Sequence, residues 1–225
     1  MDWTIERIKT IAILGGTGKE GKGLAYRWAK AGYSVIIGSR QLEKAQQAVS
    51  DLASLLPGET KLSAAVNSDA ARNCDLAVIT VPFSVHQQML LDHKEYLQGK
   101  IVIDVTVPIV PPKVTKVQLP EAGSASLEAQ QILGDGAQVV AAFQNISYEH
   151  LLHDEEVDCD VLVCGPKNAR TVVLSLVKNA GLFGVDAGPL ENSVVPEGLT
   201  SILIGINKQF GVQSSGIRIT GIPRS

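Results

Sequence analysis

The stretch Ile11-Ala-Ile-Leu-Gly-Gly-Thr-Gly-Lys-Glu-Gly-Lys-Gly23 decides the fold of this chain. It places the pattern Gly16-x-Gly18-x-x-Gly21 between an apolar, β-branched segment and apolar residues at helical spacing. In such a strand–turn–helix unit the first glycine permits the tight turn, the second lets a pyrophosphate approach the backbone, and the third lets the helix pack on the strand. The free amide groups at the start of the helix and the helix dipole favour binding of the pyrophosphate anion there. An ordinary glycine-rich turn is the alternative, and the flanking strand and helix favour a dinucleotide site.

The end of the next strand indicates which dinucleotide is bound. The run Tyr33-Ser-Val-Ile-Ile-Gly38 is typical of a parallel strand, and NAD enzymes carry an acid after this strand for the adenosine ribose. This chain has Ser39 and Arg40 there, and Lys44 follows one helical turn later. A hydroxyl and a planar guanidinium bind a 2′-phosphate, whereas a carboxylate repels it. We therefore predict NADP(H) as the cofactor; the alternative is that Arg40 is a solvated residue at a helix start.

Strand and helix patterns alternate through residue 145, which predicts an α/β fold with a doubly wound, parallel, Rossmann-type sheet. Residues 107–123 contain four prolines and are expected to form a rigid loop over the crevice at the carboxyl ends of the strands. After the first two strands, the expected strands are 61–66, 75–82, 99–106 and 137–143, and the expected helices are 41–55, 70–73, 83–97 and 126–133.

The pattern loosens after residue 145. We therefore expect a nucleotide-binding domain over residues 1–145 and a small α/β domain over residues 146–225. The apolar residues of 190–210 cover more than one face of a helix, which favours packing against the first domain and, equally, pairing with a second subunit in a homodimer. The second domain is expected to contain helices 146–153, 169–180 and 190–210 and a strand at 157–165.

The composition argues against several classes of partner. The chain has 45% hydrophobic and 19% charged residues, as soluble globular proteins do. Its net charge of -3 and the lack of a basic stripe argue against nucleic acid. Its apolar runs fall short of the ~20 residues of a membrane span, and its amino terminus lacks a secretory apolar region.

The cysteines and histidines predict neither a disulfide framework nor a metal site. Cys74, Cys159 and Cys164 are odd in number and fit no zinc or disulfide spacing, so we expect a reducing, cytoplasmic location. His150 and His153 are spaced to share a helix face, but the acidic residues after them favour a solvated helix end over a metal site.

Several segments together resemble the NADPH-dependent coenzyme F420 reductases, and the resemblance covers nearly the whole chain. The early glycine motif is shared by many dehydrogenases, whereas the segments 158–165 and 186–190 are much more specific. The segments are Gly15-Gly-Thr-Gly-x-x-Gly-x-Gly23, Gly38-Ser-Arg40 with Lys44, Thr80-Val-Pro82, Asp104-Val-Thr-Val-Pro108, Asp158-Cys-Asp-Val-Leu-Val-Cys-Gly165, Asp186-Ala-Gly-Pro-Leu190 and Gly216-Ile-Arg-Ile-Thr-Gly221.

The resemblance implies hydride transfer, in either direction, between C4 of the nicotinamide of NADP(H) and C5 of the deazaflavin of coenzyme F420. Such an enzyme mainly holds two rings face to face, so no catalytic acid or base is expected. The residues implied for NADP(H) are Gly16, Thr17, Gly18, Lys19, Glu20, Gly21, Ser39, Arg40, Lys44, Val81, Pro82 and Val85.

The deazaflavin is expected near Gln144, Asn145, Ile146 and Ser147. Archaeal members of the family tend to have a histidine in place of Gln144 and a proline in place of Ser147, so their contacts carry over poorly. The acidic tail of the coenzyme has three basic candidates, Lys113, Lys116 and Arg218, for which ordinary surface charge is the favoured reading.

Three other functions share parts of this pattern. Ferric reductase domains have a similar loop and pass electrons to a flavin. Imine and β-hydroxyacid reductases share the first domain, but they need a long helical second domain, for which too few residues follow residue 143. A sensing module would bind NADPH without turnover.

Overall fold

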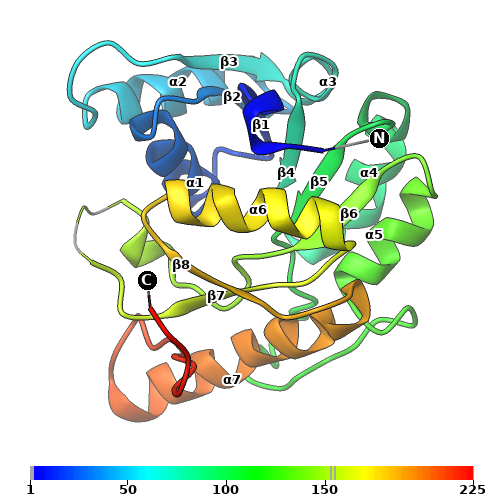
Figure 1. The fold of residues 1–225 in the computed structure, drawn as a ribbon, viewed down its shortest axis with the longest axis vertical. Helices are drawn as coiled ribbons and strands as arrows, with labels where there is room; N and C mark the ends of the chain where they lie inside the picture. Colours follow the sequence, from blue (N-terminus) through cyan, green and yellow to red (C-terminus); the bar gives the residue numbers. More distant parts are fainter. Residues whose placement is uncertain (1–2, 153, 155, 225) are drawn as a thin grey trace.

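The structure is a computed structural model that describes residues 3–152, 154 and 156–224 (Figure 1). The strands are β1 (Thr10–Leu14), β2 (Ser34–Ser39), β3 (Leu62–Val66), β4 (Leu76–Ile79), β5 (Ile101–Asp104), β6 (Gln138–Ala141), β7 (Asp160–Val163) and β8 (Phe183–Asp186). The α-helices are α1 (Lys19–Lys30), α2 (Leu42–Ala53), α3 (Asn67–Arg72), α4 (Phe83–Leu97), α5 (Ala125–Leu133), α6 (Lys167–Asn179) and α7 (Val194–Phe210). Short 3-10 helices are η1 (Ile5–Arg7), η2 (Tyr148–His150) and η3 (Leu190–Ser193).

Two parallel sheets organise the chain. The large sheet has the strand order β3-β2-β1-β4-β5-β6, and the small one pairs β7 with β8. The chain therefore starts at the centre of the large sheet, winds to one edge, and returns past β1 to wind to the other. The predicted doubly wound, Rossmann-type sheet is confirmed. Ligands of such sheets bind beyond the carboxyl ends of the strands, where the winding reverses between β1 and β4.

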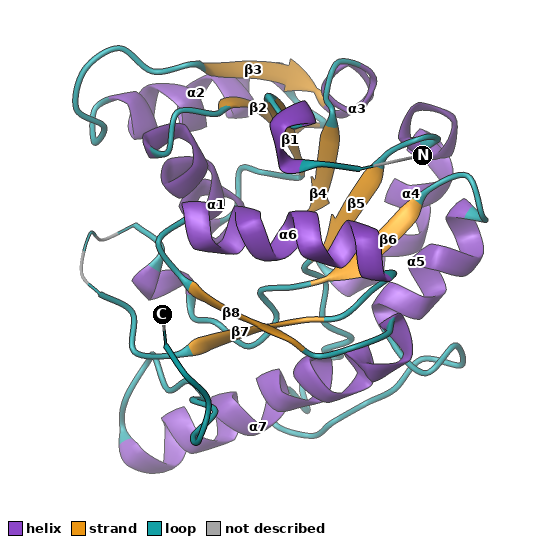
Figure 2. Cartoon of the chain, viewed as in Figure 1, coloured by secondary structure: helices purple, strands orange, loops and turns teal. Residues whose placement is uncertain are grey.

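Both faces of the large sheet are covered. Ile11 and Ile13 of β1 belong to a core cluster with residues of α1, α2 and α6, whereas Ala12 and Leu14 belong to a second cluster with residues of α3, α4 and α5. All four side chains are fully buried. Burial on both faces explains why the sequence of β1 is apolar throughout rather than alternating. Figure 2 shows α1 and α6 in front of this sheet.

The small sheet is joined to the end of β6 rather than separate from it. Ala141 and Cys164 exchange two backbone hydrogen bonds of 2.8 and 3.0 Å in an antiparallel bridge. Trp28 of α1 packs edge-on against Phe143, and its indole N–H donates to the carbonyl of Leu176 in α6 over 3.0 Å. One core cluster therefore runs from α1 into both sheets.

The helix predicted for residues 146–153 is wrong. Only the η2 turn forms there, and His153 lies outside the described residues. The guanidinium of Arg27 on α1 donates to the carbonyls of His150 over 2.6 Å and Leu151 over 2.9 Å. These two long-range hydrogen bonds hold the backbone of the segment against α1, and local helical periodicity does not encode them.

Strand β8 is absent from the sequence prediction. Three of its four side-chain positions are partly buried and the fourth is exposed, and Gly184 interrupts its apolar character, so no period-two pattern marks it. The strand forms because it pairs with β7 through four registered positions. The remaining predicted elements are present, with ends that differ by a few residues.

A buried carboxylate fixes α7 to the start of α5. Glu197 is 1% exposed, and it accepts hydrogen bonds from the N–H groups of Ala125 (2.7 Å) and Ser126 (3.1 Å) and from the Ser126 hydroxyl (2.9 Å). These amides are among the free donors of a helix start. Burial, with a further contribution from the charge of Asp104, raises the pKa of Glu197 to about 7.

We expect the free energy of unfolding to fall between about pH 4.5 and about pH 7.5 by more in the wild type than in Glu197→Gln. A group whose pKa is higher in the folded than in the unfolded state stabilises the fold when protonated, and that contribution is lost as the pH rises through the folded pKa. The difference is at most about 3 kcal/mol. Urea unfolding of both proteins at the two pH values measures it; equal pH dependence would contradict the assignment.

Candidate functional site

The glycine loop after β1 leaves no room for side chains at its tight positions. A Cβ on Gly16 would lie 2.7 Å from the carbonyl oxygen of Ile13, and a Cβ on Gly21 would lie 2.6 Å from the Cα of Gly16. Gly15 has a φ of 72°, and a Cβ there would lie 2.4 Å from Val81. The loop is joined to β2 by the N–H of Gly16, which donates to Gly38 over 3.0 Å. The sequence-based roles of Gly16 and Gly21 agree with this geometry.

Gly18 lies in different surroundings. It precedes the first residue of α1, and no heavy atom lies within 4 Å of the position of a Cβ on it. The space in front of the helix amides is therefore open on the side from which a phosphate would approach. Gly18 is not needed for packing within the chain, which is consistent with a role in binding.

Asn67 supports this loop and was not predicted from the sequence. It is buried at the start of α3, and its Oδ1 accepts a hydrogen bond of 3.2 Å from the N–H of Gly15. A Cβ on Gly38 would lie 2.8 Å from the same oxygen. An asparagine immediately after the third strand was the available signal, but its link to the loop depends on the neighbouring positions of β1, β2 and β3.

The residues predicted to bind a 2′-phosphate lie at the carboxyl end of β2. Ser39 is buried, and its hydroxyl accepts from the N–H of Gln41 over 3.2 Å. Arg40 and Lys44 are exposed. Within the part of the chain that the structure describes, neither of these two cationic side chains has a hydrogen bond or ion pair. Both charges are available to a ligand beside the glycine loop.

Three of the residues that the resemblance implies for NADP(H), Val81, Pro82 and Val85, lie between β4 and the first turn of α4. Val81 is buried against Gly15, whereas Pro82 and Val85 are exposed at the start of α4. The hydroxyl of Thr80 donates to the carbonyl of Leu14 over 3.1 Å and so ties the end of β4 to the end of β1. These contacts bring the segment 80–85 next to the glycine loop.

A cavity of about 260 Å³ lies between the end of β6 and helix α7. It contains all four residues expected near a deazaflavin and one residue of the glycine loop. Its lining is Glu20, Val105, Val107, the run Phe143–Tyr148, Thr200, Leu203, Ile204, Asn207, Gln213 and Ser215.

The backbone at Phe143 directs the next residue into this cavity. Phe143 has a φ of 75°, which is rare for a bulky side chain and is maintained by its burial against Trp28. Gln144 follows, and its Nε2 donates to the carbonyl of Asp104 over 2.7 Å, while its own carbonyl accepts from Thr200 over 2.6 Å. The side-chain oxygen Oε1 of Gln144 is buried without a hydrogen-bond partner.

The other three predicted residues offer fewer free polar atoms. Both ends of the Asn145 side-chain amide bond to the backbone of β7. Its Nδ2 donates to the carbonyl of Asp160 over 2.6 Å, and its Oδ1 accepts from the N–H of Leu162 over 3.3 Å. Ile146 contributes apolar surface. The Ser147 hydroxyl donates to the carbonyl of Gln213 and accepts from the N–H of Glu149. Gln144 is therefore the residue of this group best placed to bond a ligand.

The two residues between Gly18 and Gly21 both face the carboxyl-terminal part of the chain. The ammonium of Lys19 donates to the hydroxyl of Tyr148 over 3.0 Å and lies 4.5 Å from the centre of its ring. Glu20 lines the cavity, its buried Oε1 has no hydrogen-bond partner among the described residues, and burial raises its pKa to about 8. Sequence reasoning placed Glu20 on the phosphate loop and missed this second environment.

A buried ion pair between His86 and Asp104 holds the strand end to which Gln144 is bonded. Nε2 of His86 lies 2.9 Å from Oδ2 of Asp104, and both side chains are fully buried. Burial lowers the pKa of His86, but the charge and hydrogen bond of Asp104, together with the charges of Glu128 and Glu197, outweigh burial, so the pKa is raised overall. Asp104 Oδ1 accepts from the N–H of Thr106 over 3.0 Å. The pair fixes the end of β5, whose carbonyl holds the Gln144 amide.

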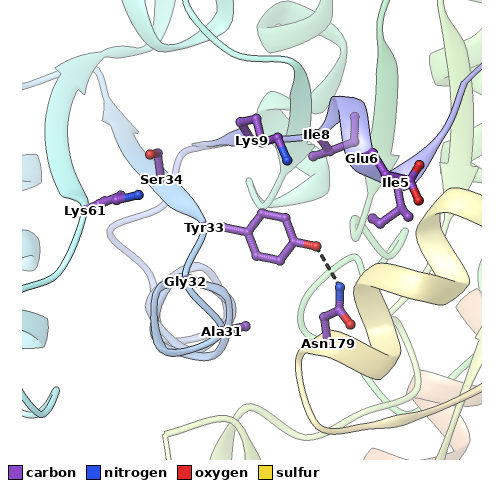
Figure 3. Close-up of a pocket in the computed structure, with 10 residues that line it drawn as sticks. All are labelled: Ile5, Glu6, Ile8, Lys9, Ala31, Gly32, Tyr33, Ser34, Lys61 and Asn179. Atoms are coloured by element: carbon purple, nitrogen blue, oxygen red, sulfur yellow. Dashed lines mark hydrogen bonds between the residues drawn. The ribbon is translucent and has the colours of Figure 1, made fainter.

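A second hollow, of about 630 Å³, lies at the other end of the sheet (Figure 3). Lys9, Ser34 and Lys61 line it at the amino ends of β1, β2 and β3. Tyr33 faces Asn179 of α6 across it, joined by a hydrogen bond of 2.7 Å. This hollow does not adjoin the glycine loop, which lies at the carboxyl end of β1.

The structure describes the ranges 3–152, 154 and 156–224. They contain no group of three or more His, Cys, Asp or Glu that is placed to hold a metal ion. His150 lies 3.2 Å from the carbonyl of Ser214, and its predicted companion His153 is outside those ranges. No helix in the same ranges is long and apolar enough to cross a membrane.

The sheet order, the glycine loop and the cations after β2 define a Rossmann-type dinucleotide-binding protein. The cavity between β6 and α7 lies beside its glycine loop. Residues 10–108 match the family model described as NADP oxidoreductase, coenzyme F420-dependent. The chain is 38% identical over 221 residues to the F420-dependent NADP reductase of Methanocaldococcus jannaschii, covering 94% of this chain and 98% of that protein. The corresponding protein of Methanothermobacter thermautotrophicus is 38% identical over 224 residues, with 96% and 97% covered. The chain belongs to the family of F420-dependent NADP reductases, which confirms the resemblance seen in the sequence.

Solved structures agree on the fold. A putative F420-dependent NADP-reductase from Arthrobacter sp. FB24 has a TM-score of 0.80 at 21% identity, with 95% of this chain and 99% of that chain covered. The reductive aminase of Aspergillus terreus has a TM-score of 0.65 at 16% identity, and the match covers 91% of this chain but only 62% of the aminase. The aminase therefore carries a large part that this chain lacks.

Substitutions at Gly18 and Gly21 separate an effect on NADPH binding from an effect on packing within the chain. We expect Gly18→Ala to leave the free energy of unfolding within about 0.5 kcal/mol of wild type, because nothing contacts the new Cβ, and to weaken NADPH binding by about tenfold or more. Gly21→Ala should lower the thermal midpoint, because its Cβ meets the backbone of Gly16. Calorimetric melting and NADPH titration separate the two; loss of stability in Gly18→Ala would contradict the assignment.

Proposed function

We propose that this protein transfers a hydride between NADP(H) and the deazaflavin of coenzyme F420. One observation carries the proposal: Glu20 lies within the glycine motif, in the first turn of α1, and also lines the cavity at the end of β6. A dinucleotide on the loop and a ring in the cavity are therefore neighbours. The relatives named F420-dependent NADP reductases support the choice of the two coenzymes.

The dinucleotide is proposed to bind along the carboxyl ends of β1, β2 and β4. Its pyrophosphate would lie against the open side of Gly18, and its 2′-phosphate against Arg40 and Lys44, where two unpaired cations are available within the described chain. The full proposed set is Gly16, Thr17, Gly18, Lys19, Glu20, Gly21, Ser39, Arg40, Lys44, Val81, Pro82 and Val85.

The deazaflavin ring is proposed to occupy the cavity beside Gln144, Asn145, Ile146 and Ser147. The volume of about 260 Å³ lies just below the ~300–1,000 Å³ of pockets that enclose whole ligands, so it suits a ring system with its tail outside. An adjoining hollow shares Tyr148, Ile204, Asn207 and Gln213 with the cavity and is also lined by Lys19 and Lys208. These lysines are better placed for an acidic tail than Arg218, which pairs with Asp158.

The chain would act mainly by positioning. A deazaflavin supplies a carbon that accepts or releases a hydride, so the protein has to hold this carbon near the nicotinamide and exclude water. The apolar wall formed by Val105, Ile146 and Leu203 would exclude water, and Gln144 would orient the ring. We place the boundary between the nucleotide-binding domain and the part that covers the ring at residue 145.

One assay separates the proposed function from the alternatives. The protein is mixed with NADPH and oxidised deazaflavin coenzyme, and the loss of deazaflavin absorbance is followed. We expect turnover with the deazaflavin. Turnover with a flavin or an imine but not with the deazaflavin would favour a flavin, ferric or imine reductase, and NADPH binding without any turnover would favour a sensing module.

Cofactor choice can be tested at Arg40. We expect Arg40→Ala to raise the dissociation constant of NADPH by about 10- to 100-fold, because hydrogen bonds to charged groups contribute about 1.5–3 kcal/mol, and to leave NADH binding nearly unchanged. Lys94→Ala, on the exposed face of α4, is the matched loss of one positive charge. Fluorescence titration gives all the constants, and tighter binding of NADH than NADPH by the wild type would overturn the assignment.

We further propose a homodimer in a cytoplasmic setting. The three cysteines are free and buried, and burial raises the pKa of Cys159 and Cys164 to about 11, as expected of unreactive thiols in a reducing compartment. Helix α7 exposes the large apolar side chains of Val195, Ile202 and Phe210.

If α7 pairs two subunits, Ile202→Lys should convert a dimer to a monomer at micromolar concentration, because it puts a charge in the centre of this apolar surface. Light scattering measures the mass, and circular dichroism confirms that the fold is retained. A monomeric wild type would remove the dimer proposal.

A further inference from the structure

Two buried side-chain oxygens in the cavity lining have no hydrogen-bond partner among the residues that the structure describes. They are Oε1 of Glu20 and Oε1 of Gln144, and both residues line the cavity between β6 and α7. Buried polar groups are nearly always hydrogen-bonded, because leaving one unsatisfied costs the desolvation of that group. Two such atoms in one cavity point to a ligand that satisfies both.

The orientation of the Gln144 amide is determined by its neighbour. Its Nε2 lies 2.7 Å from the carbonyl oxygen of Asp104, which can only accept, so this end of the amide must be the donor. Oε1 is therefore an acceptor, and it requires an N–H or O–H group from a ligand.

Glu20 provides the complementary group. No counter-ion pairs with it among the described residues, and its burial favours the neutral carboxyl, whose O–H donates. The cavity thus presents one donor and one acceptor. The titratable groups around it are Tyr148 in the cavity wall and Lys19, Glu149 and Lys208 around the adjoining hollow. On α1 itself, Lys22 pairs with Asp51 of α2.

The pyrimidine edge of a deazaflavin matches this pair. Its N3–H group donates, and its N1 atom and carbonyl oxygens accept. In the oxidised ring N1 is unprotonated, and reduction adds a hydride at C5 and a proton at N1. A neutral acid in this cavity is thus beside a ring that must gain a proton in one direction and lose it in the other.

We propose that Glu20 is the acid that exchanges this proton with N1, while Gln144 accepts from N3–H and holds the ring. The inference rests on the proposed function. In deazaflavin reduction the C4–H bond of NADPH breaks with its electron pair and a C5–H bond forms. N1 takes the proton of Glu20 as the two electrons enter the ring. NADP⁺ and the Glu20 carboxylate remain, and a proton taken up from the solvent restores the neutral acid, so each turnover consumes one proton. The reverse reaction uses the same steps.

The first test is the pH profile of hydride transfer in single-turnover experiments. Glu20→Gln keeps the shape and an N–H donor but has no proton to give. We expect its rate of deazaflavin reduction to fall by about a hundredfold, with the dissociation constant of the deazaflavin changed by no more than about threefold. The wild-type rate should fall as Glu20 ionises at alkaline pH, and the variant should lose this dependence. Glu95→Gln, an exposed acid on α4, should match the wild type.

The second test needs no bound coenzyme. The infrared difference spectrum between wild type and Glu20→Gln at neutral pH should contain the carbonyl band of a protonated carboxylic acid, which converts to a carboxylate band at alkaline pH. Glu20→Leu should raise the thermal midpoint by about 2–4 °C while losing the same activity, because it replaces an unpaired buried acid with an apolar side chain. This variant serves if Glu20→Gln folds poorly.

The results distinguish failure of the proton-transfer inference from failure of the proposed function. The inference is overturned if Glu20 is ionised at neutral pH, or if the Glu20→Gln rate and pH profile equal those of the wild type. A wild type that does not turn over the deazaflavin removes the proposed function and the proton transfer together, and the infrared band then reports the protonation of Glu20 separately. A normal wild-type rate with an unaffected variant removes only the inference.

Discussion

The site depends on the direct contact between the glycine loop and the first turn of α1. With 2.6 Å between a Cβ on Gly21 and the Cα of Gly16, only glycine lets the helix start this close to β1. The position of α1 then sets the places of Glu20, Arg27 and Trp28 along its length. Glu20 reaches the cavity, Arg27 binds the carbonyls of residues 150 and 151, and Trp28 packs on Phe143. One close approach of backbone to backbone therefore aligns the nucleotide loop with the carboxyl-terminal part of the chain.

The opposite wall of the cavity is built by polar contacts between elements far apart in sequence. The His86–Asp104 pair holds the end of β5, and the carbonyl of Asp104 holds the Gln144 amide. Thr200 of α7 donates to the carbonyl of Gln144, while Glu197, one turn earlier, caps α5. Buried groups with fixed partners are rigid, because breaking any one of them leaves an unsatisfied polar atom. This rigidity suits a reaction that requires two rings to be held at a set distance.

Two buried side-chain oxygens of the site differ from these paired groups, because neither has a hydrogen-bond partner among the described residues. Most buried side-chain groups of the site are paired within the chain, so the free oxygens of Glu20 and Gln144 mark where a ligand is needed. An apolar residue at position 20 would pack at lower cost, since an isolated acid loses its hydration without gaining a partner. An acid kept at such a position lowers stability, as residues of many functional sites do. The family assignment gives the two coenzymes, and the local chemistry gives the atoms proposed to contact them.

The sequence by itself determined the sheet, the glycine loop and the cations after β2, because these depend on local periodicity and on residues close together in the chain. Strand and helix periods, glycine sterics and the charge at Arg40 act over a few residues, so they can be recognised without the fold. Only the tertiary structure decided that residues 146–153 are not a helix, that β8 pairs with β7, that Asn67 supports the loop and that Glu20 faces the cavity. Each of these depends on a partner far away in sequence: Arg27 binds the carbonyls of residues 150 and 151, and Glu20 shares a cavity with residues that follow β6 and residues of α7. Such contacts arise from packing, and no local pattern of residues encodes them.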